Sequence, residues 1–325
     1  MKNPFSSAQC GDLIAALCSG DIPDGVQLHG CVPDEFGIVC TQALDVEQTN
    51  DSFVVRADQA RAPYPQTIWK FYADLPDGLS PEVVLPQFIT KHIPTLVGYM
   101  TYSLDGNTYT LGIITEFLGT AQDCWSAIHN DSMRPRLLAR SAELGTCLGE
   151  IHQELFRNCP HSHISGVALA NQLNVRLDEF AQASELISPF VSSARQLYNQ
   201  LTQVATIPTQ RIHGDLHLGQ ILSDTSGFYF LDFEGEPGSD NTVLDSPLRD
   251  IAGIARSFHY AGLEFPQHEF LSGYRQTTSD ETLNDMVLSA YIVDRFLYEV
   301  IYELNHRPDW VERPLSSAHF IPVLR

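Results

Sequence analysis

Near residue 120 the spacing of apolar residues changes from short strand-like runs to helical steps, and this change limits the folds open to the chain. Before it, runs rich in β-branched and aromatic residues are separated by Gly, Pro and Asp, which is typical of antiparallel strands. These runs are VQLHGCV, FGIVCTQAL, SFVVRAD and TIWKFY, within residues 26–72. After it, leucines and isoleucines recur at helical spacing, as at Leu137, Leu144, Leu148, Ile151 and Leu155. The sequence therefore predicts an α+β chain, with a small β-rich region at 1–119 and a larger, mainly helical region at 120–325.

Three further elements follow from local patterns. Asp105-Gly106 lies between two strand-like runs and predicts a hairpin turn. Helices are predicted at 170–204 and 281–305, and the second has an apolar stripe. That stripe consists of Met286, Ala290, Val293, Leu297, Ile301 and Leu304.

The charge balance disfavours some classes of partner. The chain has 325 residues and is 43% hydrophobic, as a packed globular protein is. It carries 19 Lys and Arg against 40 Asp and Glu, a formal net charge of −21. Such a surface repels phosphate backbones and anionic lipids, so we expect neither nucleic-acid nor membrane binding. An anionic nucleotide would need a local cation or backbone N–H groups.

The cysteines and the N-terminus indicate a cytoplasmic location. The seven cysteines include no C-x-x-C pair and are predicted to be buried thiols of a reducing compartment. Residues 1–20 carry one lysine, and Asp12 interrupts their short apolar run, so they do not resemble a signal peptide. No apolar run is long enough to span a bilayer.

The densest group of polar residues is RIHGDLHLGQILSDTSGFYFLDFEGEP, residues 211–237. The turn around Asp224 lies between two short apolar runs and predicts a β-hairpin. Asp215 and Gln220 precede this hairpin and Asp232 follows it, so their side chains are expected to converge. Two carboxylates and an amide oxygen suit a hard cation such as Mg²⁺. A site of this kind meets the needs of phosphoryl transfer.

Simpler interpretations exist for the same residues. His213 and His217 have the spacing of zinc ligands on a helix, but Gly214 and Gly219 favour a loop and no third ligand is near. Asp215 and Asp232 taken singly are ordinary turn formers. Their combination with Gln220 favours catalysis.

The motifs H-G-D-L-H-L-G-Q and L-D-F-E-G-E-P resemble the catalytic and metal-binding loops of the aminoglycoside-phosphotransferase/protein-kinase-like superfamily. The particular residues of these two motifs are similar to those of the maltokinases. Residues 246–261 and 298–310 also resemble maltokinase segments, in the same order, and the likeness covers about residues 53–322. It implies a two-lobed protein-kinase-like fold, with an N-terminal cap and nucleotide-binding lobe at 1–119 and a lobe with the catalytic loop and sugar site at 120–325. ATP and Mg²⁺ are the implied cofactors.

Carried over by position, the resemblance makes Asp215 the catalytic base. Gln220 and Asp232 would be metal ligands, and His213 and His217 would orient the loop. Five further residues are candidates for binding the sugar together with His217, namely Glu234, Tyr298, Glu299, Glu303 and Trp310. Without the resemblance, the last four would be a solvated helix face and core aromatics. Glu234 and Glu236 are each a candidate for either a further metal ligand or a hydrogen-bond acceptor for the sugar.

The nucleotide would be bound by the first region. Lys70 stands where the family has its ATP-phosphate lysine, and the hinge that binds adenine would be Glu116, Phe117 and Leu118. A hairpin in the first 60 residues would cover the phosphates. The family's acidic partner for the lysine is replaced by Val84, which leaves Glu82 as the nearest substitute.

The resemblance implies an ATP-dependent kinase that forms maltose 1-phosphate. This would place the chain in carbohydrate metabolism and glycogen biosynthesis, with a functional link to an enzyme that interconverts trehalose and maltose. A second hypothesis is another acceptor, such as glucosamine or an aminoglycoside, because the acidic residues would also suit an ammonium group. A third is a pseudokinase or binding module, suggested by Val84 and by only 69 residues before Lys70. Arg249 and Asp250 are expected to form a buried ion pair that fixes the hairpin.

Overall fold

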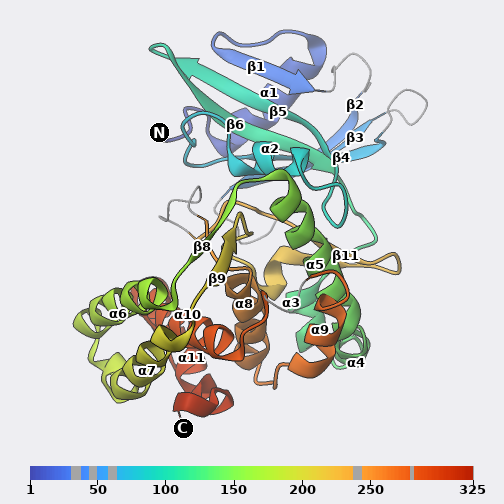
Figure 1. Ribbon diagram of the computed structural model, residues 1–325. Coiled ribbons are helices and arrows are strands. Elements are labelled where there is room, and N and C mark those ends of the chain that lie inside the picture. Colours follow the sequence, from blue (N-terminus) through green and yellow to red (C-terminus); the bar gives the residue numbers. More distant parts are fainter. Residues whose placement is uncertain (31–37, 44–49, 58–63, 237–243, 279–281, 325) are drawn as a thin grey trace. The chain divides into compact units, whose positions relative to one another are not determined.

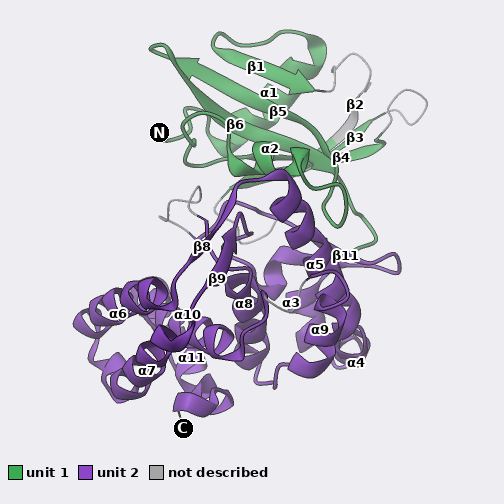
Figure 2. Cartoon of the chain, viewed as in Figure 1, with its two compact units in different colours: residues 1–121 green, residues 122–325 purple. Residues whose placement is uncertain are grey.

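The computed structural model describes residues 1–325 except 31–37, 44–49, 58–63, 237–243, 279–281 and 325. The chain divides into two compact units, Met1–Ala121 and Gln122–Arg325 (Figure 2). The first contains a large antiparallel sheet and the second is mainly helical (Figure 1). The α+β class expected from the sequence is confirmed.

Unit 1 is built on a six-stranded sheet with the order β1-β5-β6-β4-β3-β2. All five pairings in this sheet are antiparallel. The strands are β1 (Val26–Gly30), β2 (Ile38–Ala43), β3 (Asp51–Ala57), β4 (Gln66–Phe71), β5 (Leu96–Leu104) and β6 (Asn107–Glu116). Each of the four strand runs expected within residues 26–72 forms a strand in its described residues. Within the first 60 residues β2 and β3 pair antiparallel, and residues 44–49 between them lie outside the described residues.

The turn between β5 and β6 agrees with its sequence signal. Asp105 and Gly106 have φ of 51° and 82°, both in the left-handed region. Two such residues form the turn whose twist matches that of the flanking strands, and Asp-Gly supplies them at low cost.

Two short helical segments complete unit 1: α1 (Ser7–Ser19), which the sequence pattern did not predict, and α2 (Pro81–Val84), which continues as η2 (Leu85–Gln87). The capping box between Ser6 and Gln9 starts α1, and Gly20 ends it in the left-handed conformation. The buried face of α1 joins the sheet in one hydrophobic core with Phe53, Trp69, Phe71, Met100 and Leu111.

Unit 2 contains nine α-helices within its described residues. They are α3 (Cys124–His129), α4 (Arg134–Ala139), α5 (Ser141–Asn158), α6 (Gly166–Ala183), α7 (Ser188–Gln200), α8 (Leu248–Tyr260), α9 (Gln267–Tyr274), α10 (Asp285–His306) and α11 (Glu312–Ser316). Its short strands are β7 (Gln122–Asp123), β8 (His161–Ile164), β9 (Ile207–Gln210), β10 (Ile221–Ser223) and β11 (Phe228–Phe230). The 3₁₀ segments are η3 (Glu185–Ile187), η4 (Leu201–Gln203), η5 (Leu218–Gln220), η7 (Pro308–Trp310), η8 (Ser317–Phe320) and η9 (Pro322–Leu324).

Helix α8 forms the centre of unit 2. Eleven of its thirteen residues are buried, so water reaches almost no face of it. A helix buried all round must satisfy its polar side chains with protein partners. These partners come from α5, α10, η8 and the loop before β10, and this arrangement builds the candidate site.

The predicted helices are present with changed bounds. The helix expected at 170–204 is interrupted, because Ser184 caps η3 and Pro189 lies in the first turn of α7. The helix expected at 281–305 is α10, and Asn284 caps it by accepting from the Met286 and Val287 amides. Of the predicted stripe, Ala290, Val293 and Leu297 are buried, and the other three positions are partly exposed.

The cysteines that the structure describes with their side chains are free thiols. Cys10, Cys124, Cys147 and Cys159 are buried, and Cys18 is partly exposed. Burial raises the pKa of each of these thiols. None of the described helices has the length and apolar character that a membrane crossing requires.

Candidate active site

The loop between β9 and β10 carries the predicted catalytic residues and is fixed by one face of α8. Asp250 accepts hydrogen bonds from the backbone amides of His213 and Gly214, at 2.8 and 2.9 Å. Ser257, two turns later, accepts one from the Leu218 amide at 3.1 Å. Between them, a Cβ on Gly253 would lie 2.0 Å from the backbone oxygen of Leu216. Glycine is therefore required where the loop crosses the helix.

Asp250 is the anchor of this arrangement. It is almost fully buried, and His152 Nε2 lies 2.9 Å from its Oδ2. The other ring nitrogen of His152 lies 2.8 Å from the Tyr274 hydroxyl. Burial alone would raise the pKa of Asp250, but the hydrogen bond and charge of His152 and the Gly214 amide lower it. The carboxylate thus serves as a fixed acceptor for the loop.

The ion pair expected between Arg249 and Asp250 does not form. Arg249 instead contacts Glu236 at 2.5 Å and Asp245 at 2.9 Å. Successive residues of a helix point in different directions, so 249 and 250 face different neighbours. Glu236 also lies 3.5 Å from Arg176, and these contacts make it an ion-pair partner of two helices.

Asp215 lies between the Gly214 and Leu218 amides that α8 fixes, and its side chain faces α10. Its Oδ1 is 2.7 Å from Nη2 of Arg295. Two residues later, His217 Nδ1 accepts from the Gly219 amide at 3.1 Å. Burial lowers the pKa of His217, against the opposing charge of Asp215. His217 is therefore neutral near pH 7, with its proton on Nε2.

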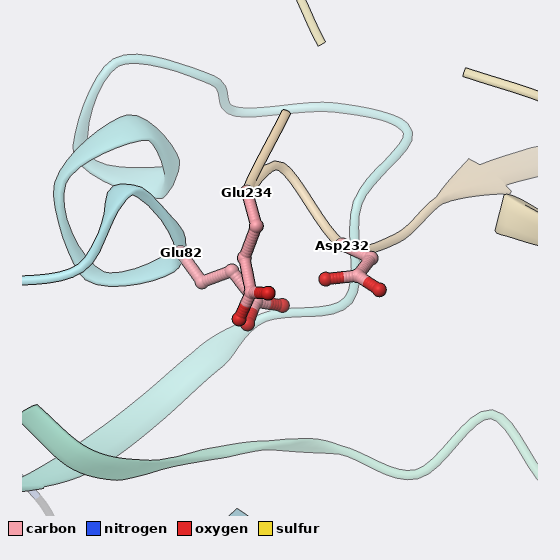
Figure 3. Close-up of side chains that lie close together, drawn as sticks. All are labelled: Glu82, Asp232 and Glu234. Carbon is pink, nitrogen blue, oxygen red and sulfur yellow. The ribbon is translucent and has the colours of Figure 1, made fainter. Parts of the chain in front are cut away.

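The predicted metal ligands lie together at the hairpin. The side-chain nitrogen of Gln220 donates to Oδ2 of Asp232 at 3.1 Å. Oxygens of Asp232 and Glu234 lie within 4.8 Å of each other after β11 (Figure 3). Asp232 has φ of 63°, an uncommon conformation for a residue other than glycine. These oxygen donors fit Mg²⁺.

A pocket of about 290 Å³ in unit 2 contains most of the predicted acceptor residues. Six of its lining residues were predicted as site residues: Asp215, His217, Tyr298, Glu299, Glu303 and Trp310. Aromatic walls with a few convergent polar groups are typical of small-molecule sites. Glu234, the remaining acceptor candidate, lies beside Asp232, which favours its alternative role near the metal.

The acids and aromatics of this pocket have defined partners. Glu299 binds Arg256 at 2.7 Å, and Glu303 accepts from the Tyr260 hydroxyl at 2.9 Å. Trp310 is 36% exposed, and the Arg313 guanidinium lies 3.8 Å from its ring centre, so part of the indole is covered.

Tyr298 presents a protonated hydroxyl to the same pocket. Burial, and then the negative charge of Glu236, raise the pKa of Tyr298 to about 12. The phenol therefore remains a hydrogen-bond donor near neutral pH.

Sequence reasoning missed six polar or aromatic residues of the pocket, namely Trp125, Ser257, Tyr260, Arg295, Tyr302 and Arg307. Two of them had a usable signal. Arg295 and Arg307 are each four residues from an acid that was predicted, Glu299 and Glu303, and therefore lie on the same face of α10. Tyr302 also lies on α10, whereas Trp125, Ser257 and Tyr260 come from helices distant in sequence.

In unit 1, Lys70 binds the acid that the sequence offered as a substitute. Its Nζ lies 2.8 Å from Oε2 of Glu82 on α2, and both side chains are largely buried. The Tyr72 hydroxyl donates to the same oxygen at 2.6 Å. Trp69 and Phe71 face the core, as strand alternation requires. The chain thus has the lysine–glutamate pair, with its acid two residues before Val84.

The predicted hinge follows the end of β6. The Phe117 amide donates to the backbone oxygen of Gln66 at 3.1 Å. The Glu116 side chain accepts from the Thr95 hydroxyl at 3.0 Å. Leu118 is partly exposed, and its backbone oxygen accepts from the Ala121 amide at 3.0 Å. Main-chain contacts therefore fix the path of this segment within unit 1.

The buried histidines of unit 2 predict a loss of stability in mild acid. Burial, and then the charge of Arg256, lower the pKa of His259 from 6.5 to about 3. The unfolded chain binds this proton at higher pH than the folded chain, so stability is fully present above pH 6.5 and falls below it. We expect a loss of about 2 kcal/mol at pH 5 from His259. The lowered pKa of His217 acts in the same direction.

Urea unfolding at pH 7 and pH 5 measures this effect in the intact chain and in His259→Asn. The substitution should reduce the pH dependence of the free energy of unfolding. An identical pH dependence in both proteins would contradict the assignment.

A family model described as the phosphotransferase enzyme family matches residues 111–283, just over half of the chain. The chain belongs to the phosphotransferase enzyme family. The matched residues include the loop with Asp215 and Gln220, the hairpin with Asp232, and helix α8.

Relatives of this phosphotransferase include two named glucosamine kinases. The one from Streptacidiphilus jiangxiensis is 23% identical over 359 residues, covering 95% of this chain and 80% of the relative. The one from Mycolicibacterium smegmatis is 23% identical over 304 residues, covering 87% of this chain and 73% of the relative.

Solved structures support the fold of the phosphotransferase. A glucosamine kinase in complex with glucosamine, ADP and inorganic phosphate superimposes with a TM-score of 0.70 at 21% identity, covering 97% of this chain and 83% of that chain. An aminoglycoside phosphotransferase in ternary complex with ADP and hygromycin B superimposes with a TM-score of 0.55 at 12% identity. The match covers 89% of this chain and 96% of that chain. The expected protein-kinase-like fold is thereby confirmed.

Proposed function

We propose that this phosphotransferase transfers the γ-phosphoryl group of ATP to a hydroxyl of an amino sugar, with glucosamine as the leading acceptor. The observation that carries the proposal is the pocket in unit 2, where Asp215 shares one surface with Glu299 and Glu303. A base and two further acids in one aromatic-walled pocket suit an acceptor that has both a reactive hydroxyl and an ammonium group.

The chemistry assigned to the pocket requires one base. Asp215 takes the proton of the acceptor hydroxyl, whose oxygen then bonds to the γ-phosphorus as the bond to the β-phosphate oxygen breaks and ADP leaves. Gln220, Asp232 and Glu234 are proposed to hold Mg²⁺, which would neutralise charge on the nucleotide phosphates when bound. Positioning and charge, and not covalent catalysis, would supply most of the rate enhancement.

The nucleotide is assigned to residues of unit 1. Lys70 is proposed to contact the ATP phosphates, and its pairing with Glu82 gives it one defined orientation. Glu116, Phe117 and Leu118 are proposed to offer backbone groups to adenine. The intact lysine–glutamate pair weakens one of the two grounds for the pseudokinase hypothesis, namely Val84 in place of the expected acid.

Glu303 supports an ammonium-bearing acceptor. Its Oε2 is buried and, among the described residues, has no hydrogen-bond partner, although Arg307 Nε lies 3.1 Å away. A buried carboxylate oxygen without a hydrogen bond is costly, so a donor from a ligand would be stabilising there. An ammonium group is such a donor and carries the complementary charge.

The relatives also favour an amino sugar, because both curated kinases described above are named for glucosamine. Maltose remains the second candidate, on the similarity of residues 298–310 to maltokinase segments. In that case the product would be maltose 1-phosphate, and an enzyme that interconverts trehalose and maltose would be a functional partner.

A coupled assay of ADP release tests the proposal with glucosamine, maltose, glucose and an aminoglycoside as acceptors. We expect kcat/KM for glucosamine to exceed that for glucose by at least about 10-fold, the value of one charge-assisted hydrogen bond. A preference for maltose would replace the proposed acceptor by the second candidate. Nucleotide binding without acceptor-dependent ADP release would contradict both.

A further inference from the structure

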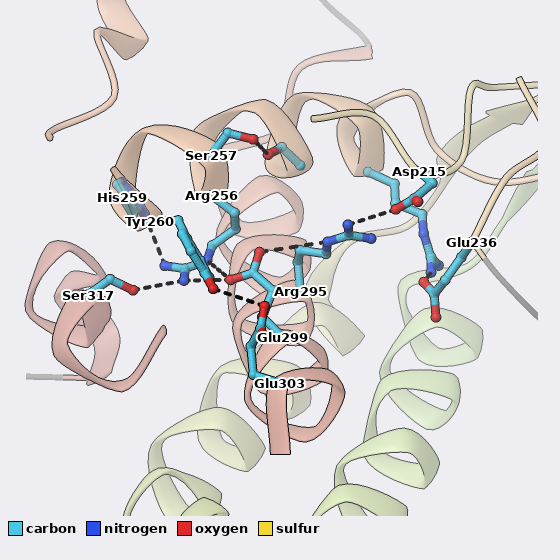
Figure 4. A network of polar contacts seen from close by, with 12 residues as sticks. Asp215, Glu236, Arg256, Ser257, His259, Tyr260, Arg295, Glu299, Glu303 and Ser317 are labelled. Carbon is cyan, nitrogen blue, oxygen red and sulfur yellow. Dashed lines mark hydrogen bonds and ion pairs between the residues drawn. The ribbon is translucent and has the colours of Figure 1, made fainter. Parts of the chain in front are cut away.

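A chain of alternating charges connects Asp215 to the centre of unit 2 (Figure 4). Arg295 Nη2 lies 2.7 Å from Asp215, and Arg295 Nε lies 3.7 Å from Glu299 Oε1. Glu299 Oε2 in turn accepts from Nη2 and Nε of Arg256, at 2.7 and 3.1 Å. Two of these residues are on α10 and one on α8, the helix that fixes the loop of Asp215.

Arg256, at the inner end of this series of charged residues, is held rigidly. Arg256 is fully buried, donates to the Ser317 hydroxyl at 2.8 Å, and packs over the Phe296 ring with 5.2 Å between guanidinium and ring centre. A buried guanidinium requires a counter-charge, because an unpaired buried charge is strongly destabilising. Glu299 supplies that charge.

The two acids of α10 therefore differ, although they are one turn apart. Both carboxylate oxygens of Glu299 lie against arginines of the protein. Glu303 has the Tyr260 hydroxyl on one oxygen, and its other oxygen lies near Arg307, which is 47% exposed at its side chain. Of these two acids, only Glu303 has a buried carboxylate oxygen that makes no hydrogen bond among the described residues, a property that Asp215 Oδ1 shares on the same pocket wall.

Arg295, at the outer end of this series of charged residues, supplies a permanent positive charge beside the proposed base. Burial alone would lower the pKa of Arg295, but Asp215 and Glu299 raise it above its ordinary value. His217 follows Asp215 in the loop and is neutral, so Asp215 has no second positive charge from this histidine. Because the Arg295 guanidinium contacts one carboxylate oxygen of Asp215, the other oxygen is left to face the acceptor hydroxyl.

We propose that Arg295 is a positioning residue that orients Asp215, that Glu299 holds Arg295 in place, and that Glu303 is the carboxylate that contacts the acceptor. The inference rests on the proposed function and assigns different roles to two acids that the sequence treated alike. Glu299 acts on the rate of transfer, and Glu303 acts on acceptor affinity.

Steady-state kinetics of matched variants with glucosamine test the assignment. Arg295→Met should lower kcat about 100-fold, since misplacing a reacting group by about 1 Å has that effect, with acceptor KM changed by less than about threefold. Arg295→Lys should restore about 10-fold of this loss, because it returns the charge without the planar fork. Glu299→Gln should lower kcat about 10-fold at unchanged KM, whereas Glu303→Gln should raise KM about 10-fold or more.

The surface variant Arg195→Met serves as the control, because its pair with Asp178 is exposed, and it should match the unsubstituted chain. Thermal unfolding of each variant separates misfolding from kinetic effects, and Arg295→Lys and Glu299→Gln keep the local volume. Full kcat in Arg295→Met, or a raised KM at constant kcat in Glu299→Gln, would overturn the inference. Failure of the unsubstituted chain to phosphorylate any acceptor would instead overturn the proposed function, and the inference with it.

Discussion

Replacing Asp215 by asparagine is expected to lower kcat by about 10³-fold while the fold is retained. The asparagine side chain has nearly the same shape and still offers an oxygen to Arg295, which lies 2.7 Å from Asp215 Oδ1. It does not take a proton from the acceptor hydroxyl. Because the contacts assigned to acceptor binding remain, KM should change little. ADP release with glucosamine and thermal unfolding measured by circular dichroism provide the two readouts.

The matched control is Asp178→Asn, at an exposed pair with Arg195 in the same unit. It should leave the rate of ADP release unchanged and the free energy of unfolding within about 0.5 kcal/mol of that of the unsubstituted chain. An Asp215→Asn protein that turns over glucosamine at the normal rate would remove the base from the proposed mechanism. The pocket would then have to be reconsidered as a binding site only.

Replacing Asp250 by asparagine is expected to reduce the free energy of unfolding by about 3–5 kcal/mol, the usual cost of removing one partner from a buried charged contact. The three donors around this carboxylate are the amides of His213 and Gly214 and the His152 ring. An asparagine NH₂ group would place a donor opposite at least one of them. Urea unfolding at neutral pH measures the change.

The same substitution should lower kcat about 100-fold, because the loop that carries Asp215 loses its anchor. The depressed pKa of Asp250 adds a pH signature: its contribution to stability is present at neutral pH and lost in strong acid, as the carboxylate is protonated. An Asp250→Asn protein as stable and as active as Asp178→Asn would show that the loop does not depend on this anchor.

Local sequence signals predicted the parts of the fold that depend on near neighbours. Asp105-Gly106 gave the β5–β6 turn, because few residue pairs adopt its two positive φ angles. The turn at Asp224 gave the β10–β11 hairpin, whose strands pair as expected. The family resemblance left Glu82 as the nearest substitute acid for Lys70, and the structure pairs these two residues.

Contacts between distant segments were not predictable in the same way. Asp250 was paired with its neighbour Arg249, but its partners are His152, 98 residues away, and the loop amides. Helix α1 was missed because its apolar face is short, and only the core shared with the sheet makes that face visible. Arg295 received no role because nothing near it in sequence indicates that Asp215 lies opposite.

The sequence by itself determined which residues are proposed to carry the chemistry, since Asp215, Gln220 and Asp232 occur in short motifs whose residue types suit a base and a hard metal ion. It also determined the α+β class, because strand and helix periods are local properties of the chain. Only the tertiary structure decided which partners each carboxylate of the pocket has. That choice depends on burial and on partners from other elements, and at Glu299 and Glu303 identical side chains one turn apart meet different neighbours.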